Sequence, residues 1–212
     1  MTTPEERSAH ARKAKKAPQS PKPWDKPAPP ETGDLDVRAL YAAVGEALSE
    51  WERMEERLSV LFSILIGLDR PSEAASRAYG SILGFRQRRE MIERAAEVYF
   101  DLHPDADLQK IFDDALEYAG GFASRRNDIA HGKVTSFFDR DKNTVFLVWP
   151  PFYNSTKMTW TGTAAYVYNS TQVDKIRLGF DETHRRINEV IRRMEARHDP
   201  EPGAKPEILG DV

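Results

Sequence analysis

The chain has 212 residues, of which 40% are hydrophobic and 31% are charged, and its formal net charge at pH 7 is −3. This length fits one ordinary domain with tails, and the near balance of charge argues against a protein that coats DNA broadly. Because the chain contains no cysteine, it can form no disulfide, no thiolate metal site and no cysteine nucleophile.

The two ends of the chain lack the apolar periodicity of a folded segment. Residues 1–33 are rich in Pro, Lys, Ala and Ser and predict a disordered basic tail, while residues 198–212 predict a disordered acidic tail. We expect the folded domain over residues 34–197. The start has no apolar stretch typical of a secretory signal, and no apolar run approaches the roughly 20 residues that span a bilayer. A cytoplasmic protein without a membrane segment is therefore expected.

Apolar residues with a period of 3.6 predict four helices in chain order. The first runs from about Asp36 to Ile66 and ends near Gly67. The second covers about 72–100, with a kink expected at Gly80 or Gly84. The third starts after Pro104, with Asp105 as its cap, and is closed by Gly132. The fourth runs over about 171–197.

The pattern changes between the third and fourth helices, over about residues 133–170. The segments KVTSFFD and TVFLVWP flank RDKN and predict a hairpin, and KMTWTG and AAYVYN are candidates for one or two further strands. The predicted fold is mainly α, a bundle of four to five helices with a small antiparallel β insert between the third and fourth helices.

One polar residue interrupts the apolar face of each predicted helix. A buried charge is costly unless it is paired, so four such residues suggest a shared polar layer in which Glu55 joins Arg89 or Arg126. The layer is either a structural ion-pair network or a support that orients Arg126 for a site. The four residues are Glu55, Arg89, Arg126 and His184.

The stretch ASRRNDIAHGKV places Arg126 and His131 at the end of the third helix. The two are five positions apart, or about 140° around an ideal helix, so they converge on one ligand only if the chain leaves the helix near Gly132. Alternatively, His131 is a capping residue that the helix dipole favours when it is protonated.

The segment RNDIAH resembles the R-x4-6-H signature of the HEPN superfamily. SEWERMEERL on the first helix, RNDIAHG at the end of the third, the β insert and the last helix together resemble bacterial HEPN-like proteins over about residues 36–197. The resemblance implies a metal-independent endoribonuclease of the kind frequent in toxin–antitoxin and anti-phage systems. It also implies a homodimer whose motifs meet at the two-fold axis, and an antitoxin protein as a further partner.

Carried over by position, the resemblance implies that Arg126 and His131 are the catalytic pair and that Asn127 supports them. Cleavage of RNA by its own 2′-OH needs a base, an acid and positive charge on the phosphorane, roles that His and Arg can fill. Many members of the superfamily have non-catalytic roles, so the alternative is a HEPN-like module that binds a protein partner, RNA or a nucleotide.

Other residues offer weaker signals. Candidate contacts to RNA are Arg86, Arg88, Arg125 and Lys133, although a solvated helix face explains such residues equally well. Aromatic residues of the β insert could stack bases, or they could simply pack the insert. The five histidines show no metal-ligand spacing such as H-E-x-x-H, and no Gly-rich phosphate loop is present, so no metal or cofactor is predicted.

Overall fold

The computed structural model describes residues 20–68 and 72–198, in which five helices and one two-stranded sheet are found. The helices are α2 (Val37–Leu65), α3 (Glu73–Gly80), α4 (Phe85–Leu102), α5 (Ala106–Ala130) and α6 (Ser170–His198). The strands β1 (Lys133–Phe138) and β2 (Thr144–Trp149) lie between α5 and α6 in sequence. The prediction of a mainly helical fold with a small antiparallel insert is confirmed.

Three helices begin at capping residues that satisfy their first free amide groups. The carboxylate of Asp36 accepts a hydrogen bond from the backbone N–H of Arg38 at the start of α2. Asp105 accepts from two backbone amides at the start of α5, and Ser72 caps α3. The predicted starts of the first and third helices therefore agree with the structure.

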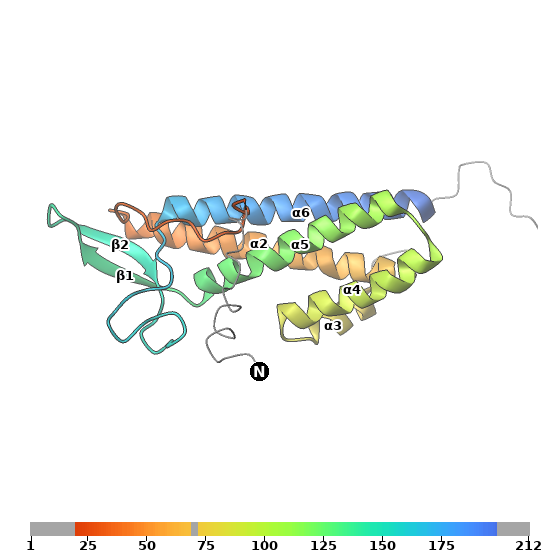
Figure 1. The fold of residues 1–212 in the computed structure, drawn as a ribbon, viewed down its shortest axis with the longest axis horizontal. Coiled ribbons are helices and arrows are strands. Elements are labelled where there is room, and N and C mark those ends of the chain that lie inside the picture. Colours follow the sequence, from red (N-terminus) through yellow and green to blue (C-terminus); the bar gives the residue numbers. More distant parts are fainter. Residues whose placement is uncertain (1–19, 69–71, 199–212) are drawn as a thin grey trace, which may run out of the picture.

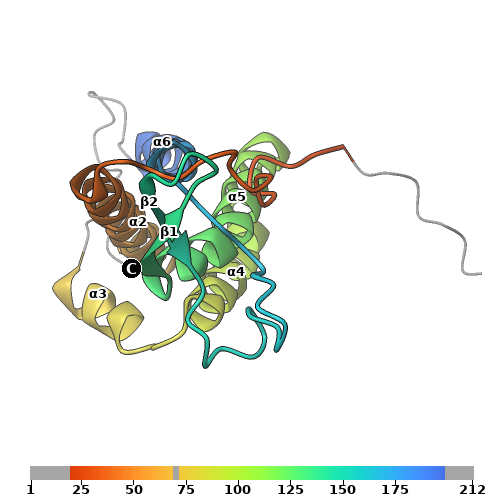
Figure 2. The same ribbon diagram turned by 90° about the vertical axis from the view of Figure 1, so that its left-hand side faces the viewer.

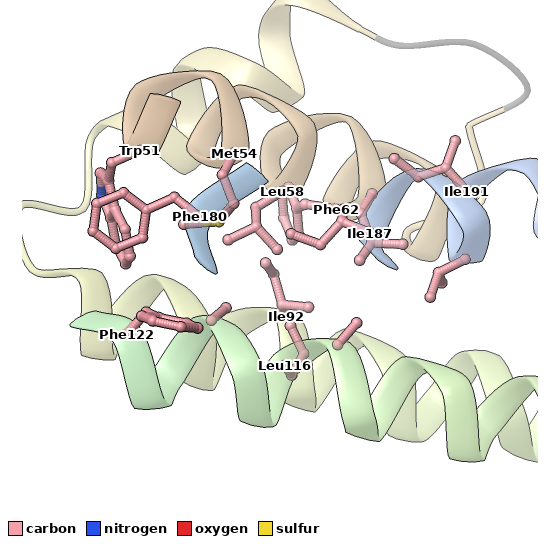
Figure 3. Packing of buried hydrophobic residues seen from close by; sticks show 14 of the residues in the cluster. Trp51, Met54, Leu58, Phe62, Ile92, Leu116, Phe122, Phe180, Ile187 and Ile191 are labelled. Carbon is pink, nitrogen blue, oxygen red and sulfur yellow. The ribbon is translucent and has the colours of Figure 1, made fainter. Parts of the chain in front are cut away.

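The helices surround a common core. α2 and α6 run side by side in the same direction, while α5 crosses the bundle in the opposite sense (Figure 1). In the end-on view α3 lies beside α2, and α4 lies below α5 (Figure 2). Leu58, Ile92, Leu116 and Ile187 bring α2, α4, α5 and α6 together and are almost fully buried (Figure 3). Each such side chain contributes about 1.5–3 kcal/mol by leaving water.

The segment predicted as one helix over 72–100 is two helices in the structure. α3 ends at Gly80 and α4 starts at Phe85, and the chain between them is not helical. Gly84 has extended backbone angles (φ −97°, ψ 133°) and is the N-cap of α4. Because glycine is a poor helix former and imposes no side-chain constraint, the chain breaks here instead of kinking.

The β insert is smaller than its sequence suggests. β1 and β2 pair antiparallel from Lys133 opposite Trp149 to Phe138 opposite Thr144. The candidates for further strands form isolated bridges only, at Val148–Tyr168 and Met158–Ala164. The bridge to Tyr168 carries two backbone hydrogen bonds, which tie the segment before α6 to β2.

Residues 20–33, which the sequence assigned to a disordered tail, contact the bundle. Trp24 makes edge-to-face contacts with Tyr118 and Phe122 of α5. Gly121 leaves room for this ring, because a Cβ there would lie 2.2 Å from a Trp24 ring carbon. The rest of the expected N-terminal tail and residues 199–212 of the expected acidic tail lie outside the described residues.

Among the helices of the described residues, none is both long and apolar enough to cross a membrane.

Candidate functional site

The end of α5 that carries RNDIAH borders a pocket of about 350 Å³. α2 and α5 form two of its walls, and the first turn of α4 with the residues before it forms the third. Arg126 and Asn127, two of the predicted site residues, are at this pocket. Its lining is made of Trp51, Glu55, Leu83, Gly84, Phe85, Arg86, Gln87, Arg88, Ala123, Arg126 and Asn127.

The pocket carries groups of the kind that bind anions in proteins, although each of its arginines also pairs with a glutamate. Three arginines and one glutamate line it, and the N-terminal turn of an 18-residue helix is at its wall. No side chain caps that turn with a hydrogen bond, so its first amide groups and the positive end of the helix dipole have no capping acceptor from a side chain. The Nε groups of Arg88 and Arg126 are buried and have no hydrogen-bond partner among the described residues. Backbone amides and guanidinium groups together are a common phosphate-binding combination.

Arg126 is held at the pocket by weak contacts. Its guanidinium lies 3.5 Å from the Oε1 atom of Glu52, whose side chain is 67% exposed. It also donates a hydrogen bond of 3.3 Å to the amide oxygen of Asn127. An exposed ion pair of this kind contributes little to stability, so Arg126 can exchange Glu52 for a bound anion at small cost.

Glu55 is buried in α2, as its position on the apolar face predicted, and it organises one wall of the pocket. It accepts hydrogen bonds from Trp51 Nε1 (3.2 Å) and from the Tyr79 hydroxyl (2.8 Å). Arg88 lies 3.3 Å from its Oε1 atom. Burial first, and the charge of Glu55 second, raise the pKa of Tyr79. The expected pairing of Glu55 with Arg89 or Arg126 is wrong, because the break before α4 places Arg88 opposite Glu55.

The supporting polar layer predicted from Glu55, Arg89 and His184 is not a single layer. Arg89 pairs with Glu93 of its own helix at 3.2 Å and lies against Gly120 of α5. The Nδ1 atom of His184 lies 3.3 Å from a carboxylate oxygen of Glu50. Each residue is buried or half-buried as expected, but a helical wheel gives the face of a residue and not its neighbour across the bundle.

A second buried network, which the sequence did not reveal, fixes the end of α5. Asp128 accepts hydrogen bonds from the Tyr168 hydroxyl (3.0 Å) and from Lys157 Nζ (3.1 Å). Arg125 lies 3.3 Å from the same carboxylate and donates to Tyr168. Burial, followed by the charge of Asp128, raises the pKa of Tyr168. The network ties the segment after β2 to α5, and it depends on contacts 29 and 40 positions apart that leave no local signal.

His131 is the C-cap of α5, and its side chain is exposed. Its backbone N–H donates to the carbonyl of Asn127 at 3.1 Å, and its imidazole does not line the pocket that Arg126 borders. Gly132 follows because a Cβ there would lie 2.7 Å from the carbonyl oxygen of Asp128. Within one chain, the structure therefore does not bring Arg126 and His131 to the same pocket.

The candidate RNA contacts have different positions. Arg86 is exposed at the pocket and pairs with Glu90, while Arg88 forms part of the pocket wall. The prediction that Arg125 contacts RNA is wrong, because its side chain is only 11% exposed and pairs with Asp128 inside the protein. Lys133 is exposed and borders a separate pocket between the hairpin and the loop after it.

The aromatic residues of the insert divide between packing and exposure. Tyr166 and Tyr168 are buried and stacked at 5.4 Å, so the interpretation as packing holds for them. Phe152, Tyr153 and Trp160 are exposed.

Comparisons of the chain with models of protein families, with curated proteins and with solved structures found no match.

Proposed function

We propose that the chain is a HEPN-like endoribonuclease that binds an RNA phosphate at the pocket between α2, α4 and α5. The observation that supports this most is the position of Arg126, at a pocket lined by two further arginines and by the uncapped first turn of α4. The resemblance of Arg126–His131 to the R-x4-6-H signature supplies the assignment to RNA cleavage.

In this mechanism Arg126 and the α4 amides hold phosphate oxygens and stabilise the charge that develops on the phosphorane. His131 provides acid–base chemistry on the 2′-OH and on the 5′ oxygen that leaves. The reaction needs both an acid and a base, and one chain supplies one histidine in the segment. A symmetric dimer formed near the end of α5 would bring two, and would place an exposed His131 beside the pocket of another copy.

A second candidate function is a non-catalytic module that binds RNA or a nucleotide at the same pocket. It is favoured by one observation, that the imidazole of His131 does not line the pocket. The two functions share the anion site and differ only in whether His131 acts on the bound molecule.

The experiment measures binding and cleavage separately. Tag-free protein is incubated with labelled single-stranded RNA and EDTA, binding is followed by fluorescence anisotropy, and products are resolved on a gel. Arg126→Ala should weaken binding about 10- to 100-fold, the loss expected for a charge-assisted contact of about 1.5–3 kcal/mol. Arg140→Ala, in the exposed hairpin turn, is the matched control and should bind as the wild type does.

His131→Ala should abolish cleavage without changing affinity, and wild-type products should end in a 2′,3′-cyclic phosphate, with DNA left intact. Binding without cleavage by the wild type would favour the second function. Equal affinity of Arg126→Ala and the wild type would refute both. Sedimentation tests the dimer, and a monomer at tens of micromolar would contradict the shared active site.

A further inference from the structure

Three potential metal ligands meet between α2 and α6, away from the pocket that contains Arg126. Asp181 and His184 are three positions apart on α6, a spacing that puts both side chains on one helix face. Glu50 faces them from α2, which runs beside α6 in the same direction (Figure 1). One ligand atom from each residue lies within 4.8 Å of the other two.

The distances are close to those of a metal site. The Nδ1 atom of His184 lies 3.3 Å from Oε1 of Glu50. A tetrahedral zinc ion at about 2.0–2.1 Å from each ligand separates neighbouring ligand atoms by roughly 3.3–3.4 Å. The pair from the two helices therefore already has the required separation. The remaining ligand atom must approach by at most about 1.4 Å, the difference between 4.8 Å and that separation, which rotation of a half-buried Asp181 side chain can supply.

Competing partners at the cluster are exposed and weak. The second oxygen of Glu50 lies 3.2 Å from Arg53, whose side chain is 68% exposed. One oxygen of Asp181 pairs with Arg185, whose side chain is 63% exposed. Such surface pairs are easily exchanged. Apart from the contact between Glu50 and His184 within the cluster, each carboxylate thus retains one oxygen for an ion. Glu50 is only 8% exposed, so its charge depends on partners inside the protein.

We propose that Glu50, Asp181 and His184 bind one divalent transition metal ion of the zinc class, which links α2 to α6. An imidazole combined with carboxylates suits zinc, nickel or cobalt better than magnesium or calcium, which prefer oxygen ligands alone. The metal has no part in the proposed cleavage, because its ligands lie outside the Arg126 pocket. Its role is to stabilise the packing of the two longest helices, since an ion that binds only the folded chain shifts the unfolding equilibrium.

The test titrates zinc chloride into tag-free protein that has been stripped with EDTA and desalted. Competition with a chromophoric zinc indicator gives the affinity, native mass spectrometry gives the stoichiometry, and a thermal melt gives the stabilisation. The wild type should bind one ion and melt at a higher temperature with zinc than with EDTA. Loss of a residue that only supports a metal ligand costs about 10- to 100-fold in affinity, so loss of a ligand should cost at least as much. We expect at least about 10-fold for Asp181→Asn, whose amide oxygen can still reach the ion, and at least about 100-fold for His184→Ala. His103→Ala, outside the cluster, is the matched control and should bind zinc as the wild type does.

Asp181→Asn keeps the test valid if His184→Ala fails to fold, because the change is nearly isosteric at a half-buried position. Zinc affinity that is the same in the wild type and in Asp181→Asn would overturn the proposal, as would a wild type that binds no zinc. RNA cleavage that persists in EDTA would support the proposed function, and a lower melting temperature in EDTA would support the metal site. If cleavage stops in EDTA, only the proposed function is weakened. If the melting temperature does not change, only the metal site is weakened.

Discussion

Replacing Glu55 with alanine should destabilise the folded chain by about 3–4 kcal/mol. The change removes the acceptor of two buried donors, Trp51 Nε1 and the Tyr79 hydroxyl, and the partner of the Arg88 guanidinium. An unsatisfied buried donor costs about 1–3 kcal/mol, and removal of one member of a buried ion pair costs about 3–5 kcal/mol. The side chain of Arg88 is 20% exposed and its guanidinium lies 5.4 Å from the Tyr79 ring centre, so the cost should fall near the lower limit.

Glu52→Ala is a matched control from the same helix. Glu52 pairs with Arg126 at 3.5 Å but is 67% exposed, so its loss should cost less than about 0.5 kcal/mol. Urea unfolding followed by circular dichroism measures both variants, and an unchanged m-value shows that the same two states are compared. The double variant Glu55→Ala/Arg88→Ala should be more stable than the sum of its single changes predicts, by at least about 1 kcal/mol. A cost for Glu55→Ala below about 1 kcal/mol, or no different from that of Glu52→Ala, would refute the buried network.

Gly132→Ala should cost about 1–3 kcal/mol in urea unfolding, because the new Cβ would lie 2.7 Å from a backbone oxygen. Gly45→Ala, where a Cβ meets nothing within 4 Å, should instead stabilise α2 by about 0.5–1 kcal/mol, and a reversed order would contradict the packing. Burial, with the charge of Asp128 second, raises the pKa of Tyr166 to about 12. Because the folded pKa lies above the ordinary value of about 10, the stability that Tyr166 contributes is complete below pH ~10 and is lost as the pH rises toward 12. Phenolate absorbance is titrated in the wild type and in Tyr166→Phe, and the difference between the two curves gives the ionisation of Tyr166. Ionisation of Tyr166 near pH 10 in the folded protein would contradict the raised pKa.

The helices were predictable because their signals are local. Asp36 and Asp105 cap the helices that their positions predicted, and the apolar period located the buried face on which Glu55 lies. The break between α3 and α4 was less predictable, since two glycines favour a kink as much as a break. Because the chain breaks before α4, packing sets the rotation of α4 about its own axis. A helical wheel therefore cannot decide whether Arg88 or its neighbour Arg89 is the partner of Glu55.

The contacts that could not be predicted from the sequence are mainly those between residues that are distant along the chain. His184 was placed correctly on the inner face of its helix, but its neighbour Glu50 is 134 positions away and carries no signal that links the two. The sequence gives no sign that Asp128 is buried, because the segment that covers it forms only isolated bridges. Irregular segments have no periodicity, so the residues that they bury cannot be found by pattern.

The residues of the RNDIAH segment and Arg125 before it lie on two sides of α5, one at the pocket and one at the loop after β2. Substitutions on the two sides should therefore affect RNA binding and RNA cleavage separately. Arg126 and Asn127 border the pocket between α2, α4 and α5, whereas Arg125 and Asp128 hold the loop after β2 against the helix end. His131 follows directly after that helix end. If the chain cleaves RNA, Asp128→Asn should lower the cleavage rate by releasing the helix end that positions His131. RNA affinity should stay within about two-fold of the wild type, because the pocket walls come from α2, from α4 and from α5 residues that precede Asp128. Anisotropy and single-turnover cleavage, measured where circular dichroism shows the variant to be folded, separate the two effects. An equal loss of affinity and rate would show that Asp128 supports the pocket itself, and that the two sides of the segment act as one site.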